Sequence, residues 1–264
     1  MKSGAAVALT GTSQLDLLLV SDLKQALRQP ACPLCRVLRN ADLYYLRVFL
    51  REGKNDGRML LRLLASWGLC ARHAGALVYL EPVEHGDGLG MGTLYDWLLD
   101  QARRRLDDLR RNLGSNGHAA PPPWGRRRNP RQRMRQALRR LVRTTPCPAC
   151  DALQRYADYV VEGFARALEP ASGLPAIQEM YLASEGLCLP HWQALLDLRP
   201  TSTLRELITG KQREAVALLK DGLEAELDRN IREEVPEGRQ KQDPAFARAL
   251  MAVAGDTSWR PAER

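Results

Sequence analysis

The chain has 264 residues, of which 45% are hydrophobic, and it carries a net charge of +8 at pH 7. No apolar run approaches the roughly 18 residues that a membrane-spanning helix needs, and the short apolar run at residues 5–9 is too weak for a signal peptide. Unpaired cysteines are typical of a reducing compartment, so we expect a cytoplasmic protein. The positive charge favours an anionic partner.

Apolar residues recur every three or four positions along most of the chain, which predicts an all-α fold. In the first part of the chain, helices are predicted at residues 15–28, 37–52, 58–66, 70–82 and 93–113. A glycine-rich loop is predicted at residues 84–92, and Thr93 is expected to cap the long helix that follows. Residues 13–113 are therefore predicted to form one helical repeat.

A segment rich in Gly, Ser, Pro and Arg at residues 114–130 predicts a linker. Helices in the same order are predicted beyond it, so residues 131–231 are expected to form a second tandem repeat. Residues 232–264 are predicted to be a polar tail. That tail is either disordered or contains a short helix that docks on a partner or on the other repeat.

Each predicted repeat contains a CPxC motif followed by a GLCxxH motif. The first pair is Cys32-Pro33-Leu34-Cys35 and Gly68-Leu69-Cys70-Ala71-Arg72-His73, and the second is Cys147-Pro148-Ala149-Cys150 and Gly186-Leu187-Cys188-Leu189-Pro190-His191. These motifs contain all six cysteines of the chain and two of its four histidines. Because no cysteine lies outside the motifs, the pattern indicates that these residues are metal ligands.

Three thiolates and one imidazole are a familiar closed, tetrahedral ligand set for structural zinc. We predict two zinc ions per chain, with the ligands Cys32, Cys35, Cys70, His73, Cys147, Cys150, Cys188 and His191. An iron–sulfur cluster on the same ligands is the alternative. Unligated core cysteines do not account for the duplicated CxxC…CxxH spacing, and a thioredoxin-like disulfide would be expected near a βαβ pattern, which the sequence lacks.

We expect each ion to be bound within one repeat. In this interpretation Cys32 and Cys35 share an ion with Cys70 and His73, and the remaining four ligands form the other site. Each repeat would then be stapled by its own Cys3His site.

An arginine-rich block between Gln101 and Thr145 contains 14 arginines and only two acidic residues, Asp107 and Asp108. Such a block can neutralise phosphate groups. Its candidate polyanion-binding residues are Arg103, Arg104, Arg126, Arg127, Arg128, Arg131, Arg133 and Arg135. The expected partners are nucleic acid or an acidic protein, and the alternative is a solvated helix face with a basic linker.

The two CPxC…GLCxxH pairs in an all-helical chain resemble an uncharacterised bacterial family known as a domain of unknown function. All eight ligand positions match the family pattern, and the resemblance covers residues 15–231. The resemblance implies the duplicated helical fold and no established activity.

Three functions follow from these patterns. The favoured one is a non-enzymatic binding or scaffold protein with two structural zinc ions. The second is an iron–sulfur electron carrier or redox sensor. The third is an enzyme with a pocket between the repeats, near His85 in the glycine-rich loop. No motif of the chain names a reaction, so a non-enzymatic role is favoured.

Overall fold

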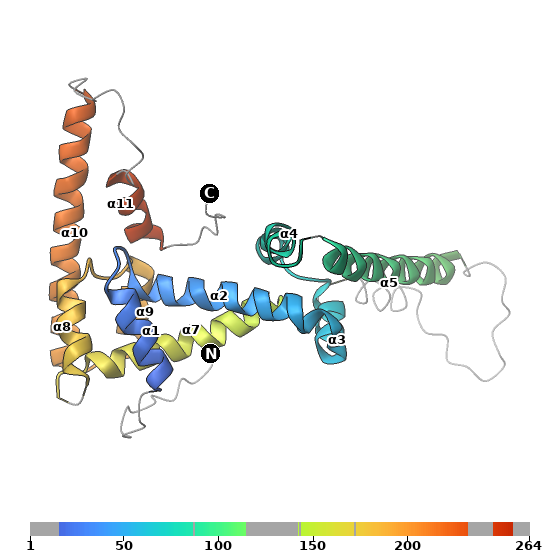
Figure 1. The fold of residues 1–264 in the computed structure, drawn as a ribbon, viewed down its shortest axis with the longest axis horizontal. Coiled ribbons are helices and arrows are strands. Elements are labelled where there is room, and N and C mark those ends of the chain that lie inside the picture. Colours follow the sequence, from blue (N-terminus) through green and yellow to red (C-terminus); the bar gives the residue numbers. More distant parts are fainter. Residues whose placement is uncertain are drawn as a thin grey trace. The chain divides into compact units, whose positions relative to one another are not determined.

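The structure is a computed structural model that describes residues 16–86, 88–114, 142, 144–171, 173–231 and 245–255. Within these ranges the chain forms ten α-helices and one short 3-10 helix and no strand, which confirms the all-α prediction (Figure 1). None of the helices found there is both long and apolar enough to cross a membrane.

The helices in chain order are α1 (Leu17–Leu27), α2 (Pro33–Arg51), η1 (Gly53–Asn55), α3 (Gly57–Ser66), α4 (Ala71–His85), α5 (Leu89–Gly114), α7 (Pro148–Leu168), α8 (Pro175–Ala183), α9 (Leu189–Asp197), α10 (Ser202–Ile231) and α11 (Ala245–Ala254). The predicted linker beyond Gly114 and the predicted helix at residues 131–143 lie almost entirely outside the described residues.

Local side-chain chemistry sets the helix starts. The carboxylates of Asp16 and Asp56 act as N-caps, because each accepts a hydrogen bond from a backbone N–H in the first turn of α1 and α3. Proline occupies the first position of α2 and α7, where its missing N–H costs no helical hydrogen bond. Each CPxC motif therefore opens a helix, as predicted.

The start of the long helix α5 differs from the prediction. Residues 89–92 belong to the helix rather than to a loop, and the Thr93 hydroxyl donates to the carbonyl of Leu89 within the helix instead of capping it. The carboxylate of Glu81, which is buried in α4, accepts from the backbone N–H of Met91 and satisfies a free donor of the first turn. The cap thus comes from a distant side chain that local sequence patterns do not reveal.

The described helices divide into two compact units that are not the two predicted repeats. Of the described residues, those within 1–41 and 154–260 belong to unit 1 and those within 42–153 belong to unit 2. Both divisions fall inside long helices, α2 and α7. Unit 1 therefore combines the start of α2 with the later part of α7, and unit 2 combines the later part of α2 with the start of α7.

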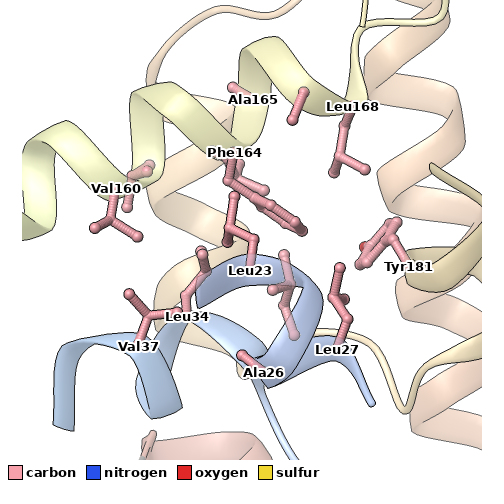
Figure 2. Packing of buried hydrophobic residues seen from close by; sticks show 14 of the residues in the cluster. Leu23, Ala26, Leu27, Leu34, Val37, Val160, Phe164, Ala165, Leu168 and Tyr181 are labelled. Carbon is pink, nitrogen blue, oxygen red and sulfur yellow. The ribbon is translucent and has the colours of Figure 1, made fainter. Parts of the chain in front are cut away.

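The core of unit 1 packs α1 and the first turns of α2 against α7 and α8 (Figure 2). Leu23, Phe164 and Tyr181 are all fully buried there. The rings of Phe164 and Tyr181 meet edge to face, with centroids 5.6 Å apart and planes at 87°. Burying a large apolar side chain of this kind contributes about 1.5–3 kcal/mol, so this core can hold the helix ends that carry metal ligands.

The core of unit 2 is formed by α2, α3, α4 and α5. Its fully buried side chains include Leu46, Leu50, Leu63 and Leu77. These leucines lie on the inward faces of short and long helices alike, as the predicted helical stripes require. The beginning of α4 and the beginning of α7, which carry four of the predicted ligands, belong to this unit.

The C-terminal segment contains a helix, α11, which contacts α9 and α10 within unit 1. The predicted short helix near residues 246–253 is thus present, and it docks on neighbouring helices of the same chain. The rest of the predicted tail lies outside the described residues.

Candidate metal centres

The eight predicted ligands gather into two groups, one in each unit. Site 1, in unit 1, consists of Cys32, Cys35, Cys188 and His191. Site 2, in unit 2, consists of Cys70, His73, Cys147 and Cys150. In each site the three sulfur atoms and one imidazole nitrogen all lie within 4.8 Å of one another. Each group is therefore a Cys3His arrangement that could hold one metal ion.

The predicted pairing of motifs is wrong. The CPxC motif of the first half meets the GLCxxH motif of the second half, and the reverse holds for the other two motifs. The four positions Cys32, Cys35, Cys70 and His73 do not form one site. Each repeat is thus not stapled by its own ion, and each site links the two halves of the sequence.

Helix lengths explain this exchange. The helix α2 begins at the first CPxC motif and has 19 residues, which makes it about 28 Å long. The helix α3 that follows has ten residues and is about 15 Å long, so a return along α3 alone would cover only about half the length of α2. In the second half, α7 has 21 residues and α8 has nine, so the same mismatch applies.

In site 1 the imidazole Nδ1 of His191 lies 3.1 Å from the Sγ of Cys188, 3.3 Å from that of Cys35 and 3.5 Å from that of Cys32. The Sγ atoms of Cys35 and Cys188 are 3.6 Å apart. All four ligands point toward one centre.

Site 2 repeats this geometry. The Nδ1 of His73 lies 3.1 Å from the Sγ of Cys70, 3.4 Å from that of Cys150 and 3.6 Å from that of Cys147. The Sγ atoms of Cys70 and Cys150 are 3.7 Å apart. The same nitrogen, Nδ1, faces the centre in both sites.

These separations can be compared with the edges of a coordination tetrahedron. With zinc–sulfur bonds near 2.3 Å and zinc–nitrogen bonds near 2.0 Å, the tetrahedron has sulfur–sulfur edges of about 3.8 Å and sulfur–nitrogen edges of about 3.6 Å. The observed sulfur–sulfur distances of 3.6 and 3.7 Å fall close to the first value, and the sulfur–nitrogen distances of 3.1 to 3.6 Å extend from below the second value up to it. Both sites therefore fit a single four-coordinate ion.

The turns before the GLCxxH ligands depend on glycine. Gly68 and Gly186 have φ angles of +85° and +80°, in the left-handed region that glycine adopts without strain. A Cβ added at Gly186 would lie 3.0 Å from the Cβ of Ala215 in α10, so the position is also crowded. Cys70 and Cys188 follow these turns as the extended N-cap residues of α4 and α9. The histidine three residues later lies on the same helix face as the cysteine.

The thiol groups of each site have unequal proton affinities. Hydrogen bonds from Cys32 and Cys35 hold the pKa of Cys188 at about 3, whereas burial raises the pKa of Cys32 well above its usual range. In site 2, burial and the neighbouring Cys70 raise the pKa of Cys150 to about 12. Burial opposes ionisation of Cys147, but hydrogen bonds from His73 and backbone groups outweigh it and bring its pKa to about 6. One thiolate thus forms readily in each site, and its negative charge opposes ionisation of a second thiol. A bound dication would offset the repulsion between the thiolates.

The imidazole of His73 has a carboxylate partner on its outer side. Its Nε2 lies 3.2 Å from the Oδ1 of Asp42, which is only 3% exposed. The other carboxylate oxygen accepts a 2.7 Å hydrogen bond from Arg72. Burial lowers the pKa of His73, but the adjacent Asp42 carboxylate and the nearby thiols outweigh it and raise the pKa to about 10. A carboxylate in this place orients a histidine ligand and increases its basicity.

Site 1 is supported by an amide instead. The buried side chain of Gln212 in α10 accepts from the backbone N–H of Leu187 at 3.2 Å and donates to its carbonyl at 2.8 Å. Leu187 immediately precedes the ligand Cys188, so this pair of hydrogen bonds fixes the turn that presents the thiol. Position 157, which corresponds to Asp42 when the CPxC motifs are aligned, is an alanine.

Neither Asp42 nor Gln212 was predicted as part of a site. Asp42 lies seven residues after Cys35, two turns along the same helix. It is a charged residue on the buried face of that helix, where apolar side chains are expected. A carboxylate on an apolar helix face indicates a buried polar partner, and this was the feature of the sequence that pointed to Asp42. Gln212 lies 24 residues after Cys188 in a long amphipathic helix, and nothing in its neighbourhood distinguishes it from a surface glutamine.

The candidate polyanion-binding residues are only partly described. Arg103 and Arg104 lie on α5, exposed to solvent, and both form ion pairs with Asp100 at 2.7 Å. The guanidinium of Arg105 stacks on the ring of Trp67 at 4.6 Å from its centre. The other candidates, Arg126, Arg127, Arg128, Arg131, Arg133 and Arg135, lie outside the described residues. The described arginines of α5 thus make local contacts, and polyanion binding stays a prediction.

The fold and its two ligand groups define an all-α protein with two candidate Cys3His metal sites that join distant parts of the chain. The chain belongs to a family of unknown function, DUF6062, whose profile matches residues 17–260. This match confirms the resemblance seen in the paired motifs. No curated protein and no solved structure matches the chain.

Proposed function

We propose that this protein is a non-enzymatic scaffold held together by two structural zinc ions. The observation that carries this proposal is the convergence of three thiols and one Nδ1 in each site, with separations close to those of a tetrahedral ion. Soft sulfur ligands with one imidazole favour zinc among the common divalent metals. Four protein ligands complete the coordination of such an ion and leave no position for a substrate, which supports a structural role.

The same distances favour a single ion over an iron–sulfur cluster. In a cluster the cysteine sulfurs bind different iron atoms with bridging sulfides between them, which spreads the ligands apart. Here all four ligand atoms of each site lie within 4.8 Å. A mononuclear centre accommodates that spacing more readily.

Each ion would link helix starts that are far apart in the sequence, which is a structural role. Site 1 joins the start of α2 to the start of α9, with Cys35 and Cys188 separated by 153 positions in the sequence. Site 2 joins the start of α4 to the start of α7, with Cys70 and Cys150 separated by 80 positions. Metal binding that closes such long loops adds directly to folding, and structural zinc contributes on the order of 10 kcal/mol.

The scaffold would engage an acidic partner, nucleic acid or an acidic protein, through the arginine-rich block. The excess of arginine between residues 101 and 145 supports this part of the proposal. Binding carried by phosphate contacts weakens linearly with the logarithm of salt concentration. Titration of a labelled single-stranded and a labelled double-stranded oligonucleotide at several salt concentrations tests it, and no binding at low salt would contradict it.

Elemental analysis of the full chain, purified without oxygen and without added metal, tests the zinc assignment. We expect two zinc ions per chain and a colourless protein. Iron with absorbance near 400 nm would instead establish the iron–sulfur alternative. Fewer than one metal ion per chain would contradict both.

A further inference from the structure

The two sites differ in how far solvent reaches corresponding ligands. Cys35 and Cys150 are both the second cysteine of a CPxC motif, yet Cys35 is only 9% exposed whereas Cys150 is exposed. Cys70 and Cys188 both open a GLCxxH helix, yet Cys188 is 1% exposed and Cys70 is partly accessible. Two thiols that are buried in site 1 are therefore more accessible to solvent in site 2, Cys70 partly and Cys150 to the greater extent.

The end of α11 provides the cover over site 1. Gly255, which terminates α11 in the left-handed region with φ +75°, has its backbone against the thiols. A Cβ added there would lie 3.6 Å from the Sγ of Cys188 and 3.9 Å from that of Cys35. These are the same two thiols that are more buried than their counterparts. The docked C-terminal helix thus shields one site, and the difference in exposure has a structural cause.

We propose that site 2 is an oxidant-sensitive metal site, in which the exposed Cys150 thiolate reacts with a peroxide and then forms a disulfide with Cys70. This inference rests on the proposed zinc occupancy. A dication held by Cys70, His73, Cys147 and Cys150 would keep these cysteines as thiolates, and the thiolate is the form that attacks peroxides. Oxidation follows thiolate character and exposure together, and site 2 combines both.

The reaction balances with a peroxide as the two-electron oxidant. The Cys150 thiolate attacks one peroxide oxygen, the O–O bond breaks, and a sulfenic acid and hydroxide form. The Cys70 thiolate, whose Sγ lies 3.7 Å away, then attacks the Cys150 sulfur and displaces a second hydroxide. Two thiolates are oxidised to one disulfide and one hydrogen peroxide is reduced to two hydroxide ions. With Cys70 and Cys150 joined in a disulfide, only Cys147 and His73 would remain as ligands of site 2, so the site would hold a dication far less tightly.

The new disulfide would connect the same two helix starts that the ion had joined. Site 2 would therefore exchange a metal link for a covalent one, while site 1 keeps its ion under its helical cover. Site 1 would in this way be a permanent cross-link between helices, and site 2 would be a cross-link whose chemistry changes with peroxide.

The test uses the full-length, zinc-loaded protein treated with hydrogen peroxide in the presence of a chromogenic zinc chelator. We expect two phases, in which the first zinc equivalent is released at least about tenfold faster than the second. Quenching after the first phase with an alkylating reagent, followed by peptide mass spectrometry, should find a Cys70–Cys150 disulfide and reduced Cys32, Cys35 and Cys188.

Two variants at corresponding positions provide the matched comparison. Cys150→Ser removes a ligand of site 2 and should abolish the fast phase and the Cys70 disulfide, whereas Cys35→Ser removes a ligand of site 1 and should abolish the slow phase. The wild-type peptide map decides the question even if a variant does not fold. Release of both ions at the same rate, or oxidation of site 1 first, would overturn the inference, and a Cys147–Cys150 disulfide would overturn the assignment of Cys70. Protein without two zinc ions at the start would instead refute the proposed function.

Discussion

The Oδ1 of Asp42 lies 3.2 Å from the Nε2 of His73, on the side of the imidazole that faces away from the three thiols. This contact joins the middle of α2 to a candidate ligand of site 2. The carboxylate favours a proton on the nearby Nε2, so Nδ1 is the nitrogen that gives up its proton when an ion binds. The corresponding residue of the other half is Ala157, so only one of the two histidines has this support from α2 or α7.

Replacement of the carboxylate should therefore weaken one site alone. Asp42→Ala is expected to lower the zinc affinity of site 2 by about tenfold to a hundredfold, because the imidazole loses its orienting partner. Competition with a chelator of known affinity, followed for both ions, measures this change. Site 1 in the same molecule is the internal control. Equal weakening of both sites, or of neither, would contradict the role given to Asp42.

The amide clamp on the Leu187 backbone should contribute measurably to stability. Gln212→Ala leaves a buried N–H and a buried carbonyl without their partners, which costs about 1–3 kcal/mol. Thermal or denaturant unfolding of the zinc-loaded protein measures the loss. Gln193→Ala, at an exposed position of α9, is the control and should change the free energy of unfolding by less than about 0.5 kcal/mol. An unchanged free energy of unfolding in Gln212→Ala would show that the turn at Leu187 does not depend on the hydrogen bonds from α10.

Zinc binding to site 2 should release protons near neutral pH. The pKa of His73 is raised to about 10 and that of Cys150 to about 12, so both groups carry a proton at pH 7 that a bound ion must displace. The apparent affinity should consequently rise with pH, by about tenfold per pH unit for each proton released. Calorimetric titration in two buffers with different ionisation enthalpies counts these protons. A binding enthalpy that does not depend on the buffer would argue against protonated ligands.

The ligand set and the helical fold could be predicted from the sequence because both depend on local patterns. Cys32 and Cys35 are close in the chain, and the fold needs only periodic apolar residues and proline at helix starts to present them together. The pairing of the motifs depends instead on where a helix of 19 residues ends, which is a question of length and not of motif. Counting the rise along α2 and α3 would have shown that the two helices differ about twofold in length and do not match as a simple hairpin.

The supports of the two sites could not be predicted in the same way. Asp42 and Gln212 act on backbone or imidazole groups that tertiary packing brings to them, and residues of their types are common on helix surfaces. The cap of α5 by Glu81 belongs to the same class. Such contacts follow from the arrangement of helices, and single-sequence patterns describe only the helices themselves.

The exchange of motifs between the two halves of the sequence is the central claim of this account. Cys70→Ser tests it most directly, with metal analysis and alkylation of the folded protein followed by peptide mass spectrometry. The variant should retain one zinc ion, and Cys147 and Cys150 should become reactive while Cys32 and Cys35 stay protected. If Cys32 and Cys35 became reactive instead, each half would hold its own ion and the pairing described above would be wrong.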